Sequence, residues 1–444
     1  MRCIVRQQQP LMQEFIEHEH AHELAAIDQI LNSVPEVLAQ VGADLVGDSD
    51  RGVGRPGLSA DQVVRALVVK QMNGFSYDEL AFHLADSICY RRFCQLGEFE
   101  KPPSRSTLQE NIKRLSAESL EAINRAIVIQ AKKDGLDDGS TVRGDCTVVD
   151  SNIHHPTDSW LLWDTVRVVV RLLQSAWEYD VGFTNHRRRA KRRFREIGNA
   201  RNREQRVPLY RDLLKMAEET LEDAENAISQ LRRFKEPQAE NLIARLLRTL
   251  VLGRRIIDQT RRRVLEEESV PSSEKLISIF EPHTDIIVKD RRSVEYGHKI
   301  CLTAGLSSLV FDCVILEGNP ADSTLATRMI ERHREILGDA PEQAAFDGGF
   351  ASKSNVDGLK KMGVKDVAFS KRCGLSISDM VKDSWVYKRL RDFRAGIEGI
   401  ISFLKRAFGL RRCPWSGFKS FKAYVWGSIL SANLLTLARY RLVM

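Results

Sequence analysis

The first strand of the protein is predicted at residues 141–151, which read TVRGDCTVVDS. β-Branched residues dominate this segment, and its apolar positions recur with the period of two that is typical of a strand. Because side chains alternate across a strand, Asp145 and Thr147 share one face while Asp150 points to the other. We therefore expect that Asp145 and Asp150 cannot line the same site.

C-terminal to this strand, the sequence alternates between strands and helices. Strands are predicted at 285–289, in a hairpin over 294–316, at the short AAF segment and at 364–370, and helices at 321–337, 352–362, 389–408 and 420–440. This alternation predicts an α/β core, a mixed sheet flanked by helices.

N-terminal to the strand, residues 10–135 read as helical throughout. Three capping boxes are predicted, at Ser59…Gln62, Ser76…Glu79 and Ser106…Gln109. A helix over roughly 60–72, an Asn73-Gly74 turn and a helix from Ser76 follow the pattern of a helix-turn-helix. Most helix pairs joined in this way bind no DNA, so a purely structural helix pair remains the alternative.

A long helical block follows the first strand. It begins near Ser159 and ends with two amphipathic helices that are broken at Glu236-Pro237, which predicts an antiparallel helical hairpin. The sequence thus predicts three parts: an all-α N-terminal domain over 1–135, a core formed by 141–158 and 281–444, and a helical, partly basic insertion over 159–280.

The positive charge of the chain is concentrated in this insertion. The whole chain has 67 Lys and Arg against 60 Asp and Glu, a net charge of +7. Residues 187–206 alone hold ten Lys or Arg and two Glu, a local balance of +8, so the remaining residues sum to −1. A polyanion would bind at this segment, and a solvated linker is the alternative. No apolar run is long enough to span a membrane, and an export signal is not apparent at the N-terminus.

Two further acidic residues lie at positions that suit a metal-binding or catalytic carboxylate. Asp347 stands at the end of a predicted strand and directly before Gly348 and Gly349, which permit close approach of a ligand. Glu398 lies on a helix that reads RDFRAGIEGIISFLKRAF from residue 391. At about 100° per residue, Glu398 shares a polar stripe with Arg394 and Lys405.

An ordinary Arg394–Glu398 ion pair on a solvated helix face would produce the same stripe. However, Gly396 and Gly399 are costly in a helix, at about 1 kcal/mol each, and they predict close packing against another element. Two acids from strands and one from a helix are the hard oxygen ligands that a two-metal phosphoryl-transfer site requires.

The order of four segments resembles that of the DDE transposases of bacterial insertion sequences, which have an RNase H-like catalytic core. These segments are GDCTVVDSNIHHPTDS, YGHK, AAFDGGF and RAGIEGIISFLK. The N-terminal stretch GRPGLSADQVVRALVVKQMNGFSYDELAFHLAD is similar to the helical DNA-binding domain of that family. The most specific match is the family's R-x₃-E-x₆-K signature, met by Arg394, Glu398 and Lys405. The Tyr that is usual three residues earlier is replaced by Arg391, and the long insertion after the first strand is a second departure.

The resemblance implies that Asp145, Asp347 and Glu398 are catalytic residues that bind two Mg²⁺ ions, for which Mn²⁺ can substitute. The implied partners are the terminal inverted repeats of the element and its target DNA, bound by a homodimer or higher oligomer in the bacterial cytoplasm at the nucleoid, without a membrane. The residues expected to contact DNA are Arg394, Lys405, Arg391, His298, Lys299, Arg187, Arg188, Arg189, Lys191, Arg192 and Arg193. For His298 on its core strand, simple packing is the alternative.

The expected function is DNA cleavage at the ends of an insertion sequence and strand transfer into a target. Two alternatives remain open at this stage. One is a catalytically inactive or domesticated DNA-binding protein derived from a transposase, and the other is an RNase H-like nuclease without strand transfer.

Overall fold

The computed structural model describes residues 17–47, 57–97, 100–290 and 293–443. The chain divides into two compact units, of which the first comprises residues 1–150 and 298–444 and the second residues 151–297. Each unit is built around a hydrophobic core of its own. The GVGRPG segment at 52–57 lies almost wholly outside the described residues.

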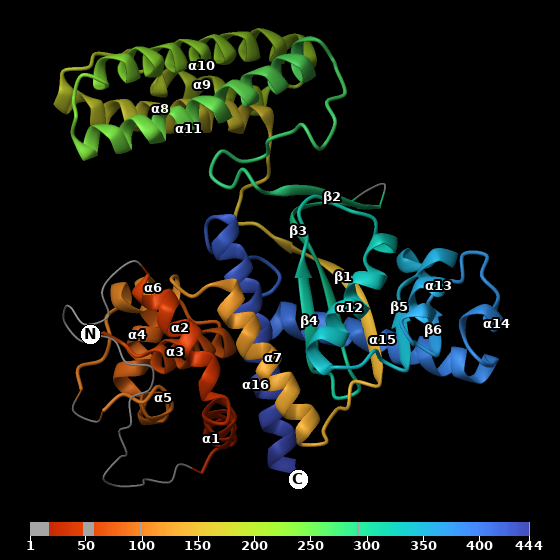
Figure 1. Ribbon diagram of the computed structural model, residues 1–444. Helices are drawn as coiled ribbons and strands as arrows, with labels where there is room; N and C mark the ends of the chain where they lie inside the picture. Colours follow the sequence, from red (N-terminus) through yellow and green to blue (C-terminus); the bar gives the residue numbers. More distant parts are fainter. Residues whose placement is uncertain (1–16, 48–56, 98–99, 291–292, 444) are drawn as a thin grey trace. The chain divides into compact units, whose positions relative to one another are not determined.

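The strands of the protein form a six-stranded mixed sheet (Figure 1). They are β1 (Thr141–Asp150), β2 (Asp285–Asp290), β3 (Ser293–Ala304), β4 (Val310–Ile315), β5 (Gln343–Phe346) and β6 (Asp366–Phe369). Their order is β2-β3-β1-β5-β6, and β4 also pairs with β3. β1, β5 and β6 are parallel, whereas β3 is antiparallel to both β2 and β4. The predicted mixed α/β fold is confirmed.

Seven helices precede the sheet in the described part of the chain. They are α1 (Glu19–Asn32), α2 (Leu38–Val46), α3 (Ala60–Asn73), α4 (Tyr77–Asp86), α5 (Ile88–Phe93), α6 (Arg105–Ile112) and α7 (Ala117–Lys133). The capping boxes at Ser59 and Ser76 are formed as predicted. Gly74 adopts a left-handed φ of +66° between α3 and α4, which confirms the predicted turn.

The third predicted capping box, at Ser106, is wrong. Ser104 is the N-cap of α6, and its hydroxyl accepts a hydrogen bond from the backbone N–H of Thr107 at 3.3 Å. The helix begins as soon as the chain leaves Pro102 and Pro103, and Ser104 is the first side chain there that can cap it.

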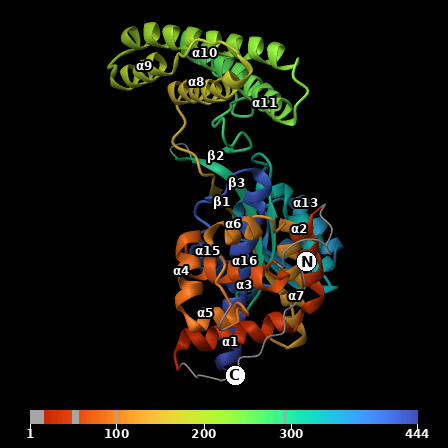
Figure 2. The ribbon, with the colours of Figure 1, turned by 90° about the vertical axis from the view of Figure 1, so that its left-hand side faces the viewer.

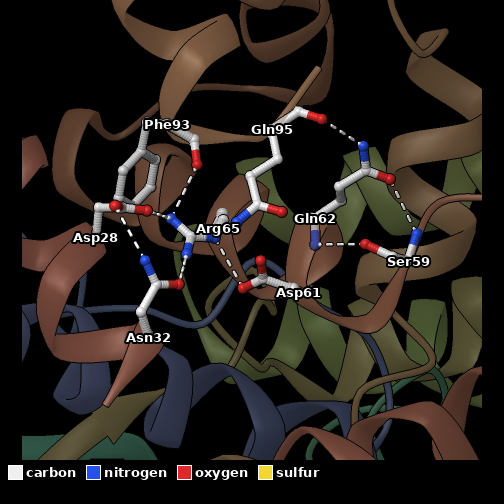
Figure 3. Close-up of polar contacts among 8 residues, drawn as sticks. All are labelled: Asp28, Asn32, Ser59, Asp61, Gln62, Arg65, Phe93 and Gln95. Carbon is white, nitrogen blue, oxygen red and sulfur yellow. Dashed lines mark hydrogen bonds and ion pairs between the residues drawn. The ribbon is translucent and has the colours of Figure 1, made fainter. Parts of the chain in front are cut away.

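A fully buried arginine joins the first helices of the protein (Figure 3). The guanidinium of Arg65 on α3 donates to Asp61 at 2.7 Å and to Asp28 on α1 at 2.5 Å. It also donates to the side chain of Asn32 at 2.8 Å and to the carbonyl of Phe93 at 3.1 Å. A buried charge is costly unless it is paired and hydrogen-bonded, and these contacts meet that condition.

The C-terminal helix α16 (Phe418–Val443) connects the N-terminal helices with the sheet. It packs against α1, α3, α7 and β4. The buried side chain of Asn433 accepts a hydrogen bond from the N–H of Val310 on β4 and donates to Asn124 on α7. Within the described residues, no helix is long and apolar enough to cross a membrane.

The other helices of the first unit flank the sheet. They are α12 (Ala326–Leu337), α13 (Lys353–Lys361), α14 (Ile377–Met380) and α15 (Ser384–Ala407), with single turns at η4 (Asp322–Thr324) and η5 (Gly348–Phe350). A further single turn, η1 (Pro35–Val37), lies between α1 and α2. α15 packs against β1, β5 and β6. These contacts bring the helix with Glu398 onto the strands with Asp145 and Asp347.

The second unit contains a bundle of four helices, which both views show side by side (Figures 1 and 2). They are α8 (Asp158–Ser175), α9 (Arg187–Asn199), α10 (Arg203–Leu231) and α11 (Pro237–Thr260), with single turns at η2 (Ala176–Tyr179) and η3 (Arg261–Leu265). The predicted helical hairpin is confirmed as α10 and α11. α8 and α9 pack on it, and Val166, Leu213 and Leu246 are fully buried among these helices.

Candidate active site

The parallel pairing of β1 and β5 places two carboxylates beside each other. Gly144 is the partner of Phe346 in the register of the two strands. Asp145 and Asp347 are the next residues along the chain, so they follow at adjacent positions. Asp145 is largely buried, and its side chain accepts a hydrogen bond from the N–H of Cys146 at 2.7 Å. Asp347 is the last residue before η5, and its carboxylate accepts from the hydroxyl of Ser370 at 2.6 Å.

Arg143 fixes α15 against β1. Its guanidinium donates to the carbonyl of Phe393 at 3.0 Å and to the hydroxyl of Ser308 at 3.0 Å, and it stacks on the Phe393 ring. A Cβ at Gly396 would lie 2.2 Å from Nη1 of Arg143, whereas one at Gly399 would meet nothing within 4 Å. The predicted close packing is therefore confirmed at Gly396 and wrong at Gly399.

The guanidinium of Arg394 lies among the three predicted carboxylates. Its Nη2 is 2.6 Å from Asp145 Oδ2 and 3.2 Å from Asp347 Oδ1, and its Nη1 is 2.9 Å from Glu398 Oε1. The side chains of Arg394 and Asp145 are each 13% exposed, that of Asp347 is 40% exposed and that of Glu398 is 68% exposed. The three acids thus form a cluster that opens to solvent on the side of Glu398.

The two aspartates differ in their electrostatic environment. Burial raises the pKa of Asp145, and the negative charge of Asp347 adds to this, while Arg394 and the N–H of Cys146 oppose it. Burial would also raise the pKa of Asp347. There the hydrogen bond from Ser370, the backbone N–H groups after Asp347 and the charge of Arg394 outweigh burial, so the pKa lies below its usual value.

Lys299 and His298 have partners within the protein rather than at the carboxylate cluster. His298 is buried, and its ring packs against the rings of Phe418 and Phe421 on α16. Lys299 donates to Asp322 at 2.7 Å. Their predicted DNA contacts remain a prediction.

A further carboxylate, which sequence reasoning missed, lies beside the turn after β5. A Cβ at Gly349 would be 2.9 Å from an oxygen of Asp322. Asp322 precedes α12 within a polar turn, and no spacing to the other acids distinguishes it from the many surface carboxylates of the chain.

The donor set at the cluster suits a hard divalent cation, because all three acids are carboxylates. Within the described residues, no group of three or more His, Cys, Asp and Glu side chains is arranged closely enough to hold a metal ion. One nitrogen of Arg394 contacts both Asp145 and Asp347, which shows that these two carboxylates can share a positive charge. The carboxylate chemistry therefore suits such an ion, although the described side chains as placed here do not form a metal site.

The remaining DNA-contact candidates of α15 lie on either side of this cluster. Arg391 is exposed one turn before Arg394, and Lys405 is partly exposed two turns beyond Glu398. Both lie on the helix that carries Glu398, as the sequence predicts.

The six candidate cations of α9 fall into two groups. Arg189 and Arg193 pair with Asp212 on α10, and Arg193 and Arg192 pair with Glu196. Arg187, Arg188 and Lys191 instead line a surface hollow of about 420 Å³, together with Asn185. Among the described residues, none of these three cations has an acidic partner within ion-pair distance.

Comparison with protein families agrees with this arrangement. Residues 12–114 match a family described as a transposase domain (DUF772), and residues 254–434 match one described as a transposase DDE domain. Together these matches cover more than half of the chain. The chain belongs to the DDE transposases. DNA is therefore the partner on which this transposase acts. The DDE match includes Asp347, Arg394 and Glu398 but begins within α11, so it does not include β1 and Asp145.

No curated protein and no solved structure matches the chain.

Proposed function

We propose that this transposase binds the ends of an insertion sequence, cleaves a DNA strand there in a metal-dependent reaction and transfers it into target DNA. The observation that carries the proposal is the convergence of Asp145, Asp347 and Glu398 on the guanidinium of Arg394. The mixed sheet with α15 packed against it is compatible with an RNase H-like core, which is the fold proposed for these residues.

Asp145, Asp347 and Glu398 would hold two Mg²⁺ ions, or Mn²⁺ in their place. When bound, such ions lower the pKa of an attacking water or hydroxyl and stabilise the leaving oxygen of a phosphodiester. Asp145, largely buried within β1, and the half-exposed Asp347, directly after β5, would supply carboxylates held by the sheet, and the exposed Glu398 would face the DNA.

Arg394 would then exchange its carboxylate contacts for phosphate oxygens near the cut. A guanidinium binds carboxylate and phosphate with the same planar fork of donors, so this exchange preserves its hydrogen bonds. Lys405 and Arg391, on the same helix, would contact the flanking DNA backbone.

The test is the replacement of each carboxylate by its amide. Asp145→Asn, Asp347→Asn and Glu398→Gln should each abolish cleavage of a donor end while binding of that end persists, because the amide keeps the shape but loses the charge that holds the ion. Cleavage and end binding are measured on the same oligonucleotides with Mg²⁺. Asp392→Asn, which changes an exposed acid on α15, is the matched control and should retain cleavage.

Different outcomes separate the competing functions. Retained cleavage in any one amide variant would remove that residue from the assignment. Cleavage without joining of the donor end to a target plasmid would indicate a nuclease that lacks strand transfer. End binding without cleavage by the unaltered protein would indicate an inactive, transposase-derived DNA-binding protein.

The basic face of α9 would track the DNA backbone in this reaction. We assign this role to Arg187, Arg188 and Lys191, whose charges are not neutralised by neighbouring acids among the described residues. Arg189, Arg192 and Arg193 stay predicted DNA contacts, and we give them a smaller part because each pairs with Asp212 or Glu196. Since two ends must be held together for transfer, the active form is proposed to be a dimer or a higher oligomer.

A further inference from the structure

A third helix, α6, packs on the helix-turn-helix of the N-terminal region, close to the start that the sequence predicts at Ser106. α3 and α4 are joined by the turn at Gly74, and α6 packs against both of them. The apolar face of α6 is buried through Leu108 and Ile112. In a three-helix unit of this kind, either the second or the third helix can present its outer face to DNA.

The outer face of α4 is unsuited to DNA. The ten residues of α4 include Asp78, Glu79 and Asp86 and no Lys or Arg. Glu79 is committed to the capping box with Ser76, and Phe82 exposes 63% of its surface beside these acids. Three carboxylates on one short helix would be repelled by the phosphates that line either groove.

The outer face of α6 has the opposite character. Ser106, Gln109 and Lys113 recur at the helical spacing that places them on one side, opposite the buried Leu108 and Ile112. Ser106 and Lys113 are exposed, and Gln109 is partly exposed. Side chains of these types donate and accept hydrogen bonds at base edges or bind phosphate in protein–DNA complexes.

The positive charge at the start of α6 is accessible to a DNA phosphate. Arg105, its first residue, pairs with Asp78 at 3.4 Å, but both side chains are more than 60% exposed. Such an exposed ion pair contributes little to stability, so a phosphate can replace Asp78. Glu110, the one acid on α6, is exposed on the same side as Ser106 and Lys113, and it pairs with Arg114 at 2.6 Å, which offsets its charge.

We propose that α6 enters the major groove of the terminal DNA of the element and reads its bases, and that α4 supports α6 from outside the groove. Arg105, Ser106 and Gln109 lie in the first turns, from which a recognition helix contacts base edges. Lys113 and Lys101, which flank them, bind the phosphate backbone. This inference deepens the proposed function and rests on the binding of the element's ends.

The experiment compares binding of the full-length protein to two DNA duplexes, one with the terminal inverted repeat that flanks the gene and one with the same bases scrambled. The double variant Ser106→Ala/Gln109→Ala should weaken binding to the repeat by about tenfold or more and leave binding to the scrambled duplex unchanged. Lys113→Gln should weaken binding to both duplexes by the same factor and lower the salt slope by about 0.9.

The matched control is Phe82→Ala/Asp86→Asn on α4, which should leave the ratio of the two affinities unchanged. Thermal unfolding of each variant verifies that the N-terminal helices remain folded. A lower ratio in the α4 variant, or an unchanged ratio in the α6 double variant, would overturn the assignment of α6 while end binding itself stands. Equal affinity of the unaltered protein for both duplexes would contradict the proposed end recognition and this inference with it.

Discussion

At the scale of single residues, Arg394 offsets the repulsion between the negative charges of Asp145 and Asp347. Asp145 and Asp347 lie close enough that the charge of Asp347 raises the pKa of Asp145, and a shared guanidinium nitrogen offsets this repulsion. The polar stripe of Arg394 and Glu398 follows from helical spacing and could be predicted. That Arg394 would reach across to both strands could not, because this contact depends on how α15 docks.

The docking of α15 gives a prediction at Gly396. Gly396→Ala should displace the guanidinium of Arg143 from the carbonyl of Phe393, which costs about 1–3 kcal/mol for a buried group left without its partner. The gain of about 1 kcal/mol from replacing a helical glycine offsets part of this cost. We expect a net decrease of about 1 kcal/mol in the free energy of unfolding, measured by urea denaturation, and a reduced cleavage rate.

The control for this prediction is the second glycine of the same helix. Gly399→Ala places its Cβ in open space, so it should raise the free energy of unfolding by up to about 1 kcal/mol through helix propensity alone. If the two variants changed stability equally, Arg143 would not be the reason for the glycine at position 396. The sequence predicts close packing at both glycines, because helix propensity carries no information about the side chain that faces each of them.

At the scale of elements, α9 shows why a charge count overstates a binding surface. The sequence suggested that the ten cations of residues 187–206 act together as a DNA-binding arm, yet two of them, Arg189 and Arg193 on α9, share Asp212 on α10. Asp212 lies outside the counted segment, and it meets these arginines only because α9 packs against α10. The packing of α8 and α9 on the predicted hairpin could not be predicted for the same reason. An amphipathic pattern indicates a helix, but it does not show against which other helix the apolar face packs.

The division of cations on α9 can be measured by salt dependence. The triple variant Arg187→Gln/Arg188→Gln/Lys191→Gln should weaken DNA binding, because fewer phosphates are neutralised. The slope of log K against log salt should fall by about 0.9 for each phosphate that no longer has a cationic partner. Cleavage by the carboxylate cluster at saturating DNA should persist. Binding is measured by fluorescence anisotropy over a range of salt concentrations.

A control of equal charge isolates the position of these cations. Arg232→Gln/Arg233→Gln/Lys235→Gln removes three exposed charges just after α10 in the same bundle. It should change the slope far less than the α9 variant. Equal slopes of log K against log salt for the two triple variants would show that DNA binding depends on the net charge of the bundle and not on the position of Arg187, Arg188 and Lys191.

At the scale of the whole molecule, the packing divides the chain differently from the sequence. The sequence predicts an N-terminal domain that ends near residue 135, and this division remains a prediction. The contacts combine the N-terminal helices with β1 and with the chain from His298 onward in one compact unit, and they place residues 151–297, with the helical insertion and β2, in the other. The sequence could not show this, because the connection is made by α16, the last helix of the chain, through the buried Asn433 and its contacts with α7 and β4.

A single substitution in α3 tests whether this unit behaves as one. Leu67 is fully buried and packs close to Gly427 on α16. Leu67→Ala should lower the free energy of unfolding of the first unit by about 2–5 kcal/mol, the range for such a core truncation. Because the unit shares one core, hydrogen exchange should accelerate in β1 and β5 as well as in α3, while α10 and α11 keep their protection.

The matched variant in the second core is Leu221→Ala on α10, which should accelerate exchange in α10 and α11 and leave β1 and β5 unchanged. Faster exchange confined to residues 17–133 in Leu67→Ala would show that the N-terminal helices open as an independent domain, as the sequence predicts. Joint protection of the N-terminal helices and the sheet would have a direct consequence for the reaction. The helices proposed to read the element's end would then be coupled through α16 to the strands that position Asp145 and Asp347.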